Sequence, residues 1–203
     1  MSLFDFLFGN KVASNSEILD DRIWISQNAK FKGLARELVE RPNRDSVAIL
    51  LVGHFADTLE KLTAVTGAYQ GNFPVMATLA NQMTVDIASK LSLGPADIIE
   101  LIVAERHPLS SADDRLLQFA EELPCRCRVS HHLALDDPLL KQFVGEWLAG
   151  ILESLGMTED EAVESNMVSR RVKQAQQKIE SSALGNRDAD SAEEWFKENM
   201  PNG

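Results

Sequence analysis

Apolar residues in this chain fall into short continuous runs that alternate with stretches of helical spacing. The runs have the length of strands buried on both faces, and the stretches between them predict helices. Because several runs are followed by a helical stretch, the order predicts βα units of a parallel sheet. The expected strands are 47–53, 73–79, 98–104 and 125–135, and the expected helices are 26–40, 57–65, 83–91 and 111–123.

The remainder of the chain is expected to be helical. Asp137-Pro138 begins a helix with an apolar stripe that runs to Leu155 and closes at Gly156. Beyond it, Thr158-x-x-Glu161 and Ser191-x-x-Glu194 have the pattern of capping boxes. We expect a charged helix over 167–181 and a short final helix that carries Trp195 and Phe196.

Together these elements predict an α/β fold: a mostly parallel sheet of four to five strands flanked by helices on both faces, with a helical C-terminal extension. We divide the chain into an apolar N-terminal turn and linker (1–20), the α/β domain (21–156) and the extension (157–203). The N-terminal turn lacks the basic region of a secretory signal. We expect it to dock on the body of this protein or on a partner.

Charge and composition narrow the class of protein. Asp and Glu number 31 against 20 Lys and Arg, a formal net charge of −11, which argues against a nucleic-acid or anionic-membrane partner. Apolar residues make up 44%, enough for a real core, and no run reaches the roughly 18 residues of a membrane span. Two cysteines do not form a disulfide scaffold. We therefore expect a cytoplasmic protein.

Several common catalytic motifs are absent from the sequence. It contains no G-x-x-x-x-G-K-[ST] loop to cradle phosphates and no G-x-G-x-x-G after a strand. It also lacks the G-x-S-x-G of a nucleophile elbow. The residues alone name no reaction.

One cluster has the residue types of a zinc site. Cys125, Cys127, His131 and His132 offer four nitrogen or sulfur ligands within eight positions. On a continuous strand, however, His132 would point to the face opposite the other three, so all four converge only if the strand breaks. The alternative is a half-buried strand that carries two free thiols.

A second group of candidates lies where expected strands end. Gly53, His54, Glu105, Arg106 and His107 follow two of the apolar runs, and ligands of parallel α/β sheets gather at the carboxyl ends of strands. The alternative for Glu105-Arg106-His107 is a hydrogen-bonded structural corner.

Two pairs of carboxylates stand at helix starts. The Asp113-Asp114 and Asp136-Asp137 pairs are explained by interaction with the helix dipole, without catalysis.

Segments in order along the chain resemble the second RecA-like motor domain of SecA, the ATPase that drives preprotein export. Residues 21–31, DRIWISQNAKF, are similar to its D-x-(I/V)-(Y/W)-x-T-x-x-x-K-F opening, and 105–107 match its T-E-R-H corner, with Ala104 in place of threonine. Residues 132–140 are similar to Y-L-S-L-E-D-D-L-M. Residues 155–168 and 174–180 follow L-G-M-x-E-x-E-x-I-E-x-x-M-V and x-A-Q-x-K-V-E, where the motor meets its scaffold helix. The resemblance implies a RecA-like domain over 21–156.

The departures from this family concern its catalytic cations. The resemblance covers no first motor domain with a Walker A loop, and the arginines of the family's Q-L-R-G-R-S-G-R-Q-G segment fall on Leu117, Phe119 and Glu122 when counted from His107. Apolar or acidic side chains cannot replace guanidinium groups beside a phosphate. We therefore expect a degenerate form that does not hydrolyse ATP.

The resulting functional hypothesis is a non-catalytic SecA-like protein that acts as an interaction or regulatory module linked to preprotein export. We expect no cofactor, with weak ATP or ADP binding as the exception. The expected partner is a protein, or a second copy paired through the C-terminal helices. The alternative is a nucleotide-responsive regulator, or an ATPase half-site that needs a Walker-bearing partner in trans.

Overall fold

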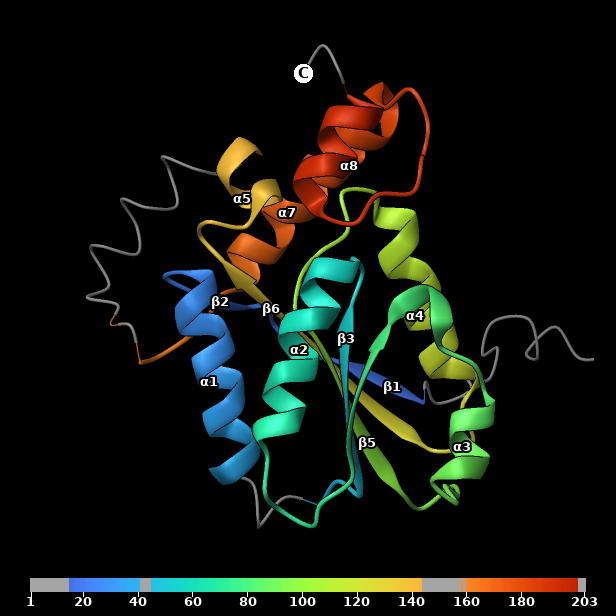
Figure 1. Ribbon diagram of the computed structural model, residues 1–203. Helices are drawn as coiled ribbons and strands as arrows, with labels where there is room; N and C mark the ends of the chain where they lie inside the picture. The colour runs from blue at the N-terminus through green and yellow to red at the C-terminus, as the bar shows by residue number, and fades with distance from the viewer. Residues whose placement is uncertain (1–14, 41–44, 144–157, 159, 201–203) are drawn as a thin grey trace, which may run out of the picture.

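The computed structural model describes residues 15–40, 45–143, 158 and 160–200. These residues form an α/β fold with a mostly parallel β-sheet flanked by helices (Figure 1). The described strands form one sheet of seven in the order β4-β3-β5-β6-β2-β7, with β1 also paired to β6. The pairing of β2 with β7 is antiparallel and the other pairings are parallel. The strands are β1 (Ser16–Ile18), β2 (Arg22–Trp24), β3 (Ala48–Gly53), β4 (Val75–Leu79), β5 (Ile98–Val103), β6 (Arg126–Ala134) and β7 (Val163–Glu164).

The four long strands confirm the sequence prediction, and three short strands extend the sheet beyond the expected four to five. Every residue of β3 and β5 is buried, as their apolar runs predict. Glu100 is the one charged residue within β5, and its Oε1 accepts from Ser46 Oγ at 2.9 Å. The outer edge of β6 is shared, because β1 pairs with residues 127–129 and β2 with residues 132–134. Strands of two or three residues carry no readable alternation, and β1 lies where a polar linker was expected.

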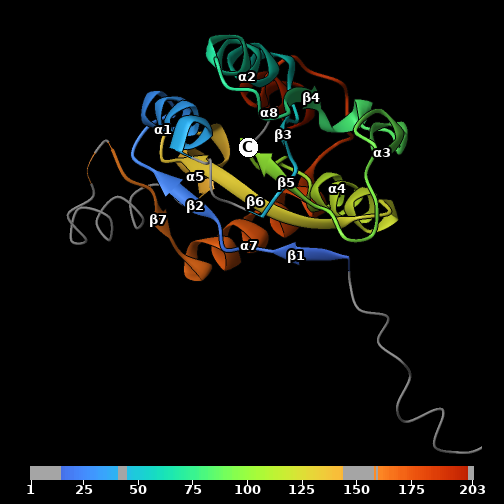
Figure 2. The same ribbon diagram turned by 90° about the horizontal axis from the view of Figure 1, so that it is seen from below.

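Helices cover both faces of the sheet (Figure 2). Ile49 and Leu51 pack under α1 and α2, whereas Leu50 and Val52 lie in the core beneath α3 and α4 on the opposite face. This alternation along β3 fixes its register, because a slip by one residue would exchange the two sets. The helices are α1 (Gln27–Glu40), α2 (Ala56–Ala68), α3 (Asp86–Lys90), α4 (Ser110–Glu122), α5 (Pro138–Phe143), α7 (Asn166–Ser182) and α8 (Ala192–Asn199), with a 3₁₀ turn η1 (Ala80–Gln82).

A glycine allows α1 to approach the sheet closely. A Cβ atom on Gly33 would lie 1.9 Å from the ring of Trp24 on β2, so only glycine lets the helix rest on that indole. Trp24 is almost completely buried there. The contact brings the start of α1 to the same end of the sheet as the loops that follow β3 and β5.

Helix starts follow the predicted capping residues in some places and not in others. Ser191 Oγ accepts a hydrogen bond from Glu194 N at 3.2 Å, which confirms a capping side chain at α8. The capping box expected at Thr158 is wrong, because residues 163–164 extend along β2 as β7 and α7 begins after Ser165. Ser165 Oγ accepts from Val168 N there.

The C-terminal helices fold back on the sheet. Val172 and Ile179 of α7 and Trp195 and Phe196 of α8 share one buried cluster with Phe55, at the start of α2. We call residues 183–200 the C-terminal segment. Residues 53–58 and 104–109, where β3 and β5 end and their loops begin, are called the carboxyl end of the sheet. Figure 1 shows α8 above that end.

Two expectations fall partly or wholly on residues outside the description. The predicted helix from Pro138 to Leu155 is described as far as Phe143, and the apolar turn over 1–9 lies outside the described residues. Within the described ranges, no helix has the length and apolar character needed to cross a membrane.

Candidate functional site

The carboxyl end of the sheet brings together the residues that the sequence analysis marked as ligand candidates. Gly53 ends β3, and a Cβ on it would lie 3.1 to 3.3 Å from atoms of Thr58 and Leu59 in the first turn of α2. His54 follows, and its backbone N–H donates to Glu105 Oε1 at 2.8 Å. The side chain of Glu105, in the loop after β5, therefore binds the backbone of the loop after β3.

Glu105 places a carboxylate at the start of α2. Its Oε1 accepts from the amides of both His54 and Phe55, at 2.8 and 3.1 Å, and its Oε2 accepts from Thr58 Oγ1 at 2.9 Å. Burial raises the pKa of Glu105, and these hydrogen bonds and the charges of His54 and Lys30 oppose the rise. The carboxylate acts as an internal anion at a helix N-terminus.

Arg106 is held between two buried carboxylates. Its Nη2 lies 2.6 Å from Asp21 Oδ1, and its Nη1 lies 3.1 Å from Asp113 Oδ2. Burial alone would lower the pKa of Arg106, but the two carboxylates outweigh it and raise the pKa. Burial raises the pKa of Asp21 against the pull of Arg106. The guanidinium is therefore committed to partners within the chain.

Asp113 is the centre of this network. Besides Arg106, it receives Gln176 Nε2 at 2.8 Å and the amide of His107 at 3.3 Å, and His54 Nε2 lies 2.9 Å away. Burial alone would raise the pKa of Asp113, but the adjacent imidazole of His54 and the guanidinium of Arg106 hold it well below its usual range. The sequence interpretation of Asp113 as a helix-dipole partner missed this role.

His107 is a buried, neutral ring. Its Nδ1 accepts from Leu109 N at 3.0 Å, and burial lowers its pKa to about 3. The ring stacks on Phe55 and meets Trp195 of α8 edge-on, with centroids 5.3 and 5.6 Å apart. Its carbonyl accepts from Gln176 Nε2 at 2.7 Å, so both C-terminal helices contact this residue.

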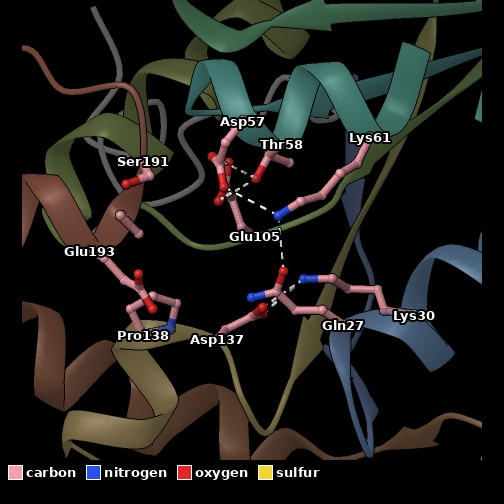
Figure 3. Close-up of a pocket in the computed structure, with 11 residues that line it drawn as sticks. Gln27, Lys30, Asp57, Thr58, Lys61, Glu105, Asp137, Pro138, Ser191 and Glu193 are labelled. Carbon is pink, nitrogen blue, oxygen red and sulfur yellow. Dashed lines mark hydrogen bonds and ion pairs between the residues drawn. The ribbon is translucent and has the colours of Figure 1, made fainter. Parts of the chain in front are cut away.

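A small cavity of about 230 Å³ opens beside Glu105, between α1, α2 and α8 (Figure 3). Lys30, almost fully buried, binds both carboxylate oxygens of Asp137 at 2.8 and 2.9 Å, and Lys61 binds Asp57 and Gln27. The sequence analysis explained Asp137 by the dipole of the helix that follows it. Instead, its carboxylate holds Lys30 and accepts from Ala134 N at 2.7 Å. Both lysines of this cavity already hold a carboxylate.

A larger cavity of about 570 Å³ is lined in part by Phe55. It is bounded by the ends of β3 and β4, the first turns of α4 and the C-terminal segment. His54, His107 and Arg115 are among its lining residues, together with Trp195. Its volume is in the range of small-molecule sites. The ligand role of His54 and His107 stays a prediction.

The four metal candidates do not gather around one point. Cys125 and Cys127 are buried free thiols, and Cys127 Sγ donates to the carbonyl of Ala120 at 3.5 Å. His132 Nδ1 accepts from Trp24 Nε1 at 3.2 Å, whereas His131 Nδ1 lies 3.9 Å from Asp21. Across the part of the chain that the structure describes, no group of three or more His, Cys, Asp or Glu side chains is arranged to hold a metal ion.

Sequence reasoning missed Asp21, Lys30, Gln176 and Trp195 as residues of this end of the sheet. A signal for two of them was present, because Asp21 and Lys30 are the charged positions of the D-x-(I/V)-(Y/W)-x-T-x-x-x-K-F pattern. The structure buries both against an opposite charge. When a motif combines charged and apolar positions, as this one does, its charged residues can therefore belong to buried ion pairs.

Comparison with known proteins identifies what the chain resembles. No protein-family model matches it. It is 38% identical over 82 residues to "Protein translocase subunit SecA" of Dichelobacter nodosus, covering 40% of this chain and 9% of that protein. It is 27% identical to the SecA subunits of Clostridium kluyveri and Desulfotalea psychrophila over 188 and 185 residues, or 81% and 79% of this chain.

These matches establish a SecA-like region that covers about four fifths of the chain. The chain spans about a fifth or less of the length of these relatives. The sequence resemblance to SecA is thereby confirmed, and the α/β sheet is consistent with the RecA-like fold that it implied.

Proposed function

We propose that this chain is a SecA-like module with a role related to protein translocation, and that it does not itself hydrolyse ATP. The first part rests on similarity to proteins named as translocase subunits. The second part rests on the state of the cations at the carboxyl end of the sheet. Phosphoryl transfer depends on cationic groups aimed at the charge that develops on the phosphate.

The observation that carries the proposal is the commitment of Arg106. It is the arginine of the Glu-Arg-His corner, and both of its terminal nitrogens are occupied by Asp21 and Asp113. Release of either contact would leave a buried carboxylate without its counter-charge, at a cost of several kcal/mol. Arg106 is therefore poorly suited to move onto a phosphate.

The positions that match the family's arginines also favour a non-catalytic role. All three lie on α4, where Leu117 and Phe119 pack against the core cluster beneath the helix. Glu122 is exposed and accepts from Gln118 Nε2 at 3.0 Å. An acidic side chain there would repel a phosphate rather than stabilise it.

As an interaction module, the chain would act through a protein partner or self-association in the cytoplasm. The apolar faces of α7 and α8 are buried in the chain's own core. Contacts through these helices would thus use their polar faces, where Arg170, Lys173 and Lys178 of α7 are exposed. The net charge of −11 favours a protein over a nucleic acid as the partner.

A phosphate-release assay on the purified chain tests the absence of turnover. We expect release at the rate of a protein-free blank, at micromolar chain and millimolar ATP with Mg²⁺. Turnover that is abolished by Arg106→Lys or His107→Asn would overturn the proposal. Because those variants can lose stability, Arg115→Ala, an exposed position on the larger cavity, serves as a second variant.

The larger cavity favours one second candidate, a nucleotide-responsive regulator or a half-site completed in trans. Its 570 Å³ would admit a mononucleotide, and Arg115 supplies a cation at its wall. Calorimetric titration with ADP and ATP distinguishes the two functions. Binding tighter than about 100 µM that Arg115→Ala weakens at least tenfold favours the regulator. Arg170→Ala on α7 is the matched control and should leave the affinity unchanged.

A further inference from the structure

Strand β4 forms a lateral edge of the sheet. Among the described strands it pairs with β3, in the parallel register Ile49 to Val75 through Gly53 to Leu79. Figure 2 shows it at the margin of the sheet, between α2 and α3. Since the other side of β4 is the border of the sheet, part of its backbone points away from β3.

The register defines which backbone groups point outward. Ile49 N donates to the carbonyl of Pro74, so the pairing of Ile49 with Val75 uses the groups of residues 74 and 76. In a parallel pair, successive residues of one strand direct their N–H and C=O groups to opposite sides. Met76 and Thr78 therefore bond toward β3, and Val75, Ala77 and Leu79 present their N–H and C=O groups at the border.

This border lies within the longest uncharged stretch of the chain. No Asp, Glu, Lys or Arg occurs in residues 62–85, although such residues make up 25% of the sequence. Edge strands of monomeric proteins are commonly protected by charged side chains, often lysine. Here the strand and both of its flanks lack them, and Met76 and Val85 are 37% and 49% exposed.

We propose that β4 pairs antiparallel with β4 of a second copy of this chain. The three outward residues are centred on Ala77, so a two-fold axis there sets Ala77 opposite Ala77 and Val75 opposite Leu79. Such pairs exchange both of their N–H···O bonds in an antiparallel ladder. The same surface on both copies thus completes itself, as an isologous interface requires.

Charge favours a second copy as the occupant. Two chains that each carry −11 repel one another wherever acidic surfaces meet. The uncharged stretch is where two copies can approach without that repulsion, and it offers no charge to attract an oppositely charged partner. A second copy is therefore the occupant that fits this surface.

The flanking helix can add to the contact. A stable interface buries more surface than one five-residue ladder provides, on the order of 1,200 Å² in total. The second half of α2, which packs against β4, exposes Thr63, Ala64, Gly67 and Ala68. Nothing lies within 4 Å of where a Cβ of Gly67 would be. These small, uncharged positions would let α2 of two copies come close.

Light scattering after size-exclusion chromatography, over 1 to 200 µM chain, tests the pairing. We expect the dimer mass at high concentration, with amides of Val75, Ala77 and Leu79 protected from hydrogen exchange as the dimer forms. Met76→Lys should weaken the dimer at least 100-fold. Met167→Lys on α7, an exposed methionine (46% against 37% for Met76) outside β4 and its flanks, is the control and should not change it.

Ala77→Pro is an independent variant, because it removes an outward N–H while leaving the hydrogen bonds of Met76 and Thr78 to β3 in place. It should also give monomers with an unchanged circular dichroism spectrum. The monomer mass at every concentration would overturn the proposal, including the case in which β4 pairs with a strand of another protein. A dimer that survives both Met76→Lys and Ala77→Pro would overturn it equally.

Discussion

The carboxyl end of the sheet and the β4 border differ in how their polar groups are satisfied. At the carboxyl end, Arg106 and Asp113 find partners within the chain, and Trp195 of the C-terminal segment packs on the neighbouring His107. Along β4, the outward groups of Val75, Ala77 and Leu79 belong to a strand paired on one side. The polar groups around Arg106 and Asp113 thus form a closed region that is satisfied by internal contacts, although the larger cavity lies beside it at His54 and His107. The outward backbone groups of β4 are the ones that the proposed dimer would use. The position of polar residues in a fold does not show by itself where the protein makes its contacts.

Removal of the central carboxylate should have the largest effect on the closed region. Asp113→Ala takes one partner from Arg106 and one of the two acceptors from Gln176, and leaves buried polar groups with fewer partners. We expect a loss of about 3–5 kcal/mol in the free energy of unfolding, measured by urea denaturation. Asp114→Ala, at the exposed neighbouring position, should stay within about 0.5 kcal/mol. Equal effects of the two would mean that charge does not hold this end together.

Truncation of the α8 indole should open the closed region from outside. Trp195 is 1% exposed, packs on His107, and donates its Nε1–H to Asn186 Oδ1 at 2.8 Å. Trp195→Ala should cost about 3 kcal/mol and speed hydrogen exchange at the amide of Asp57, which donates to the carbonyl of Asp190. Exposed Lys197→Ala is the control. Unchanged exchange at Asp57 would show that α8 does not shield this end.

A smaller effect should appear as a pH dependence of stability. The pKa of His107 is about 3 in the folded chain and near 6.5 when unfolded, because burial disfavours the charged ring. Between these values the unfolded chain binds a proton that the folded chain does not, so stability falls as the pH falls from 6.5 toward 3. The burial of His131 acts in the same direction, whereas the raised pKa values of Asp21 and Glu105 act against it.

The variant His107→Asn measures how much of this pH dependence of stability comes from the His107 ring. It should reduce the slope of unfolding free energy against pH by up to about 1.4 kcal/mol per pH unit between pH 6 and 4. Above pH 7 the ring is neutral in both states, so the variant and the parent should have the same slope there. Identical slopes at acidic pH would mean that the ring takes up its proton in the folded chain.

The long strands could be read from the sequence because burial on both faces demands continuous apolar runs. β3 and β5 have six residues each, all buried, and Glu100 of β5 is the one charged residue among them. The same reasoning placed Gly53, His54 and Glu105 at one end of the sheet, where His54 N donates a hydrogen bond to Glu105 Oε1. It could not find β7, because two residues carry no periodicity and their extension depends on pairing with β2.

The partners of the candidate residues could not be read from the sequence. Asp21 lies 85 positions before Arg106, and Gln176 lies 63 positions after Asp113. An aspartate in the first turn of a helix normally faces solvent and the helix dipole, and nothing local distinguishes Asp113 from its neighbour Asp114. Asp113 is buried because α7 packs over the start of α4. Tertiary packing decided its role.

The carboxylate of Glu105 has a consequence for any phosphate compound that approaches the start of α2. The amides of His54 and Phe55 already donate to Glu105 Oε1, which is covalently part of the chain. A tethered group competes at an effective concentration far above that of a dissolved metabolite, since it gives up no translational freedom on binding. An incoming anion would therefore have to displace the Glu105 carboxylate, which cannot diffuse away. We expect this helix start to bind phosphate poorly even at high phosphate concentration.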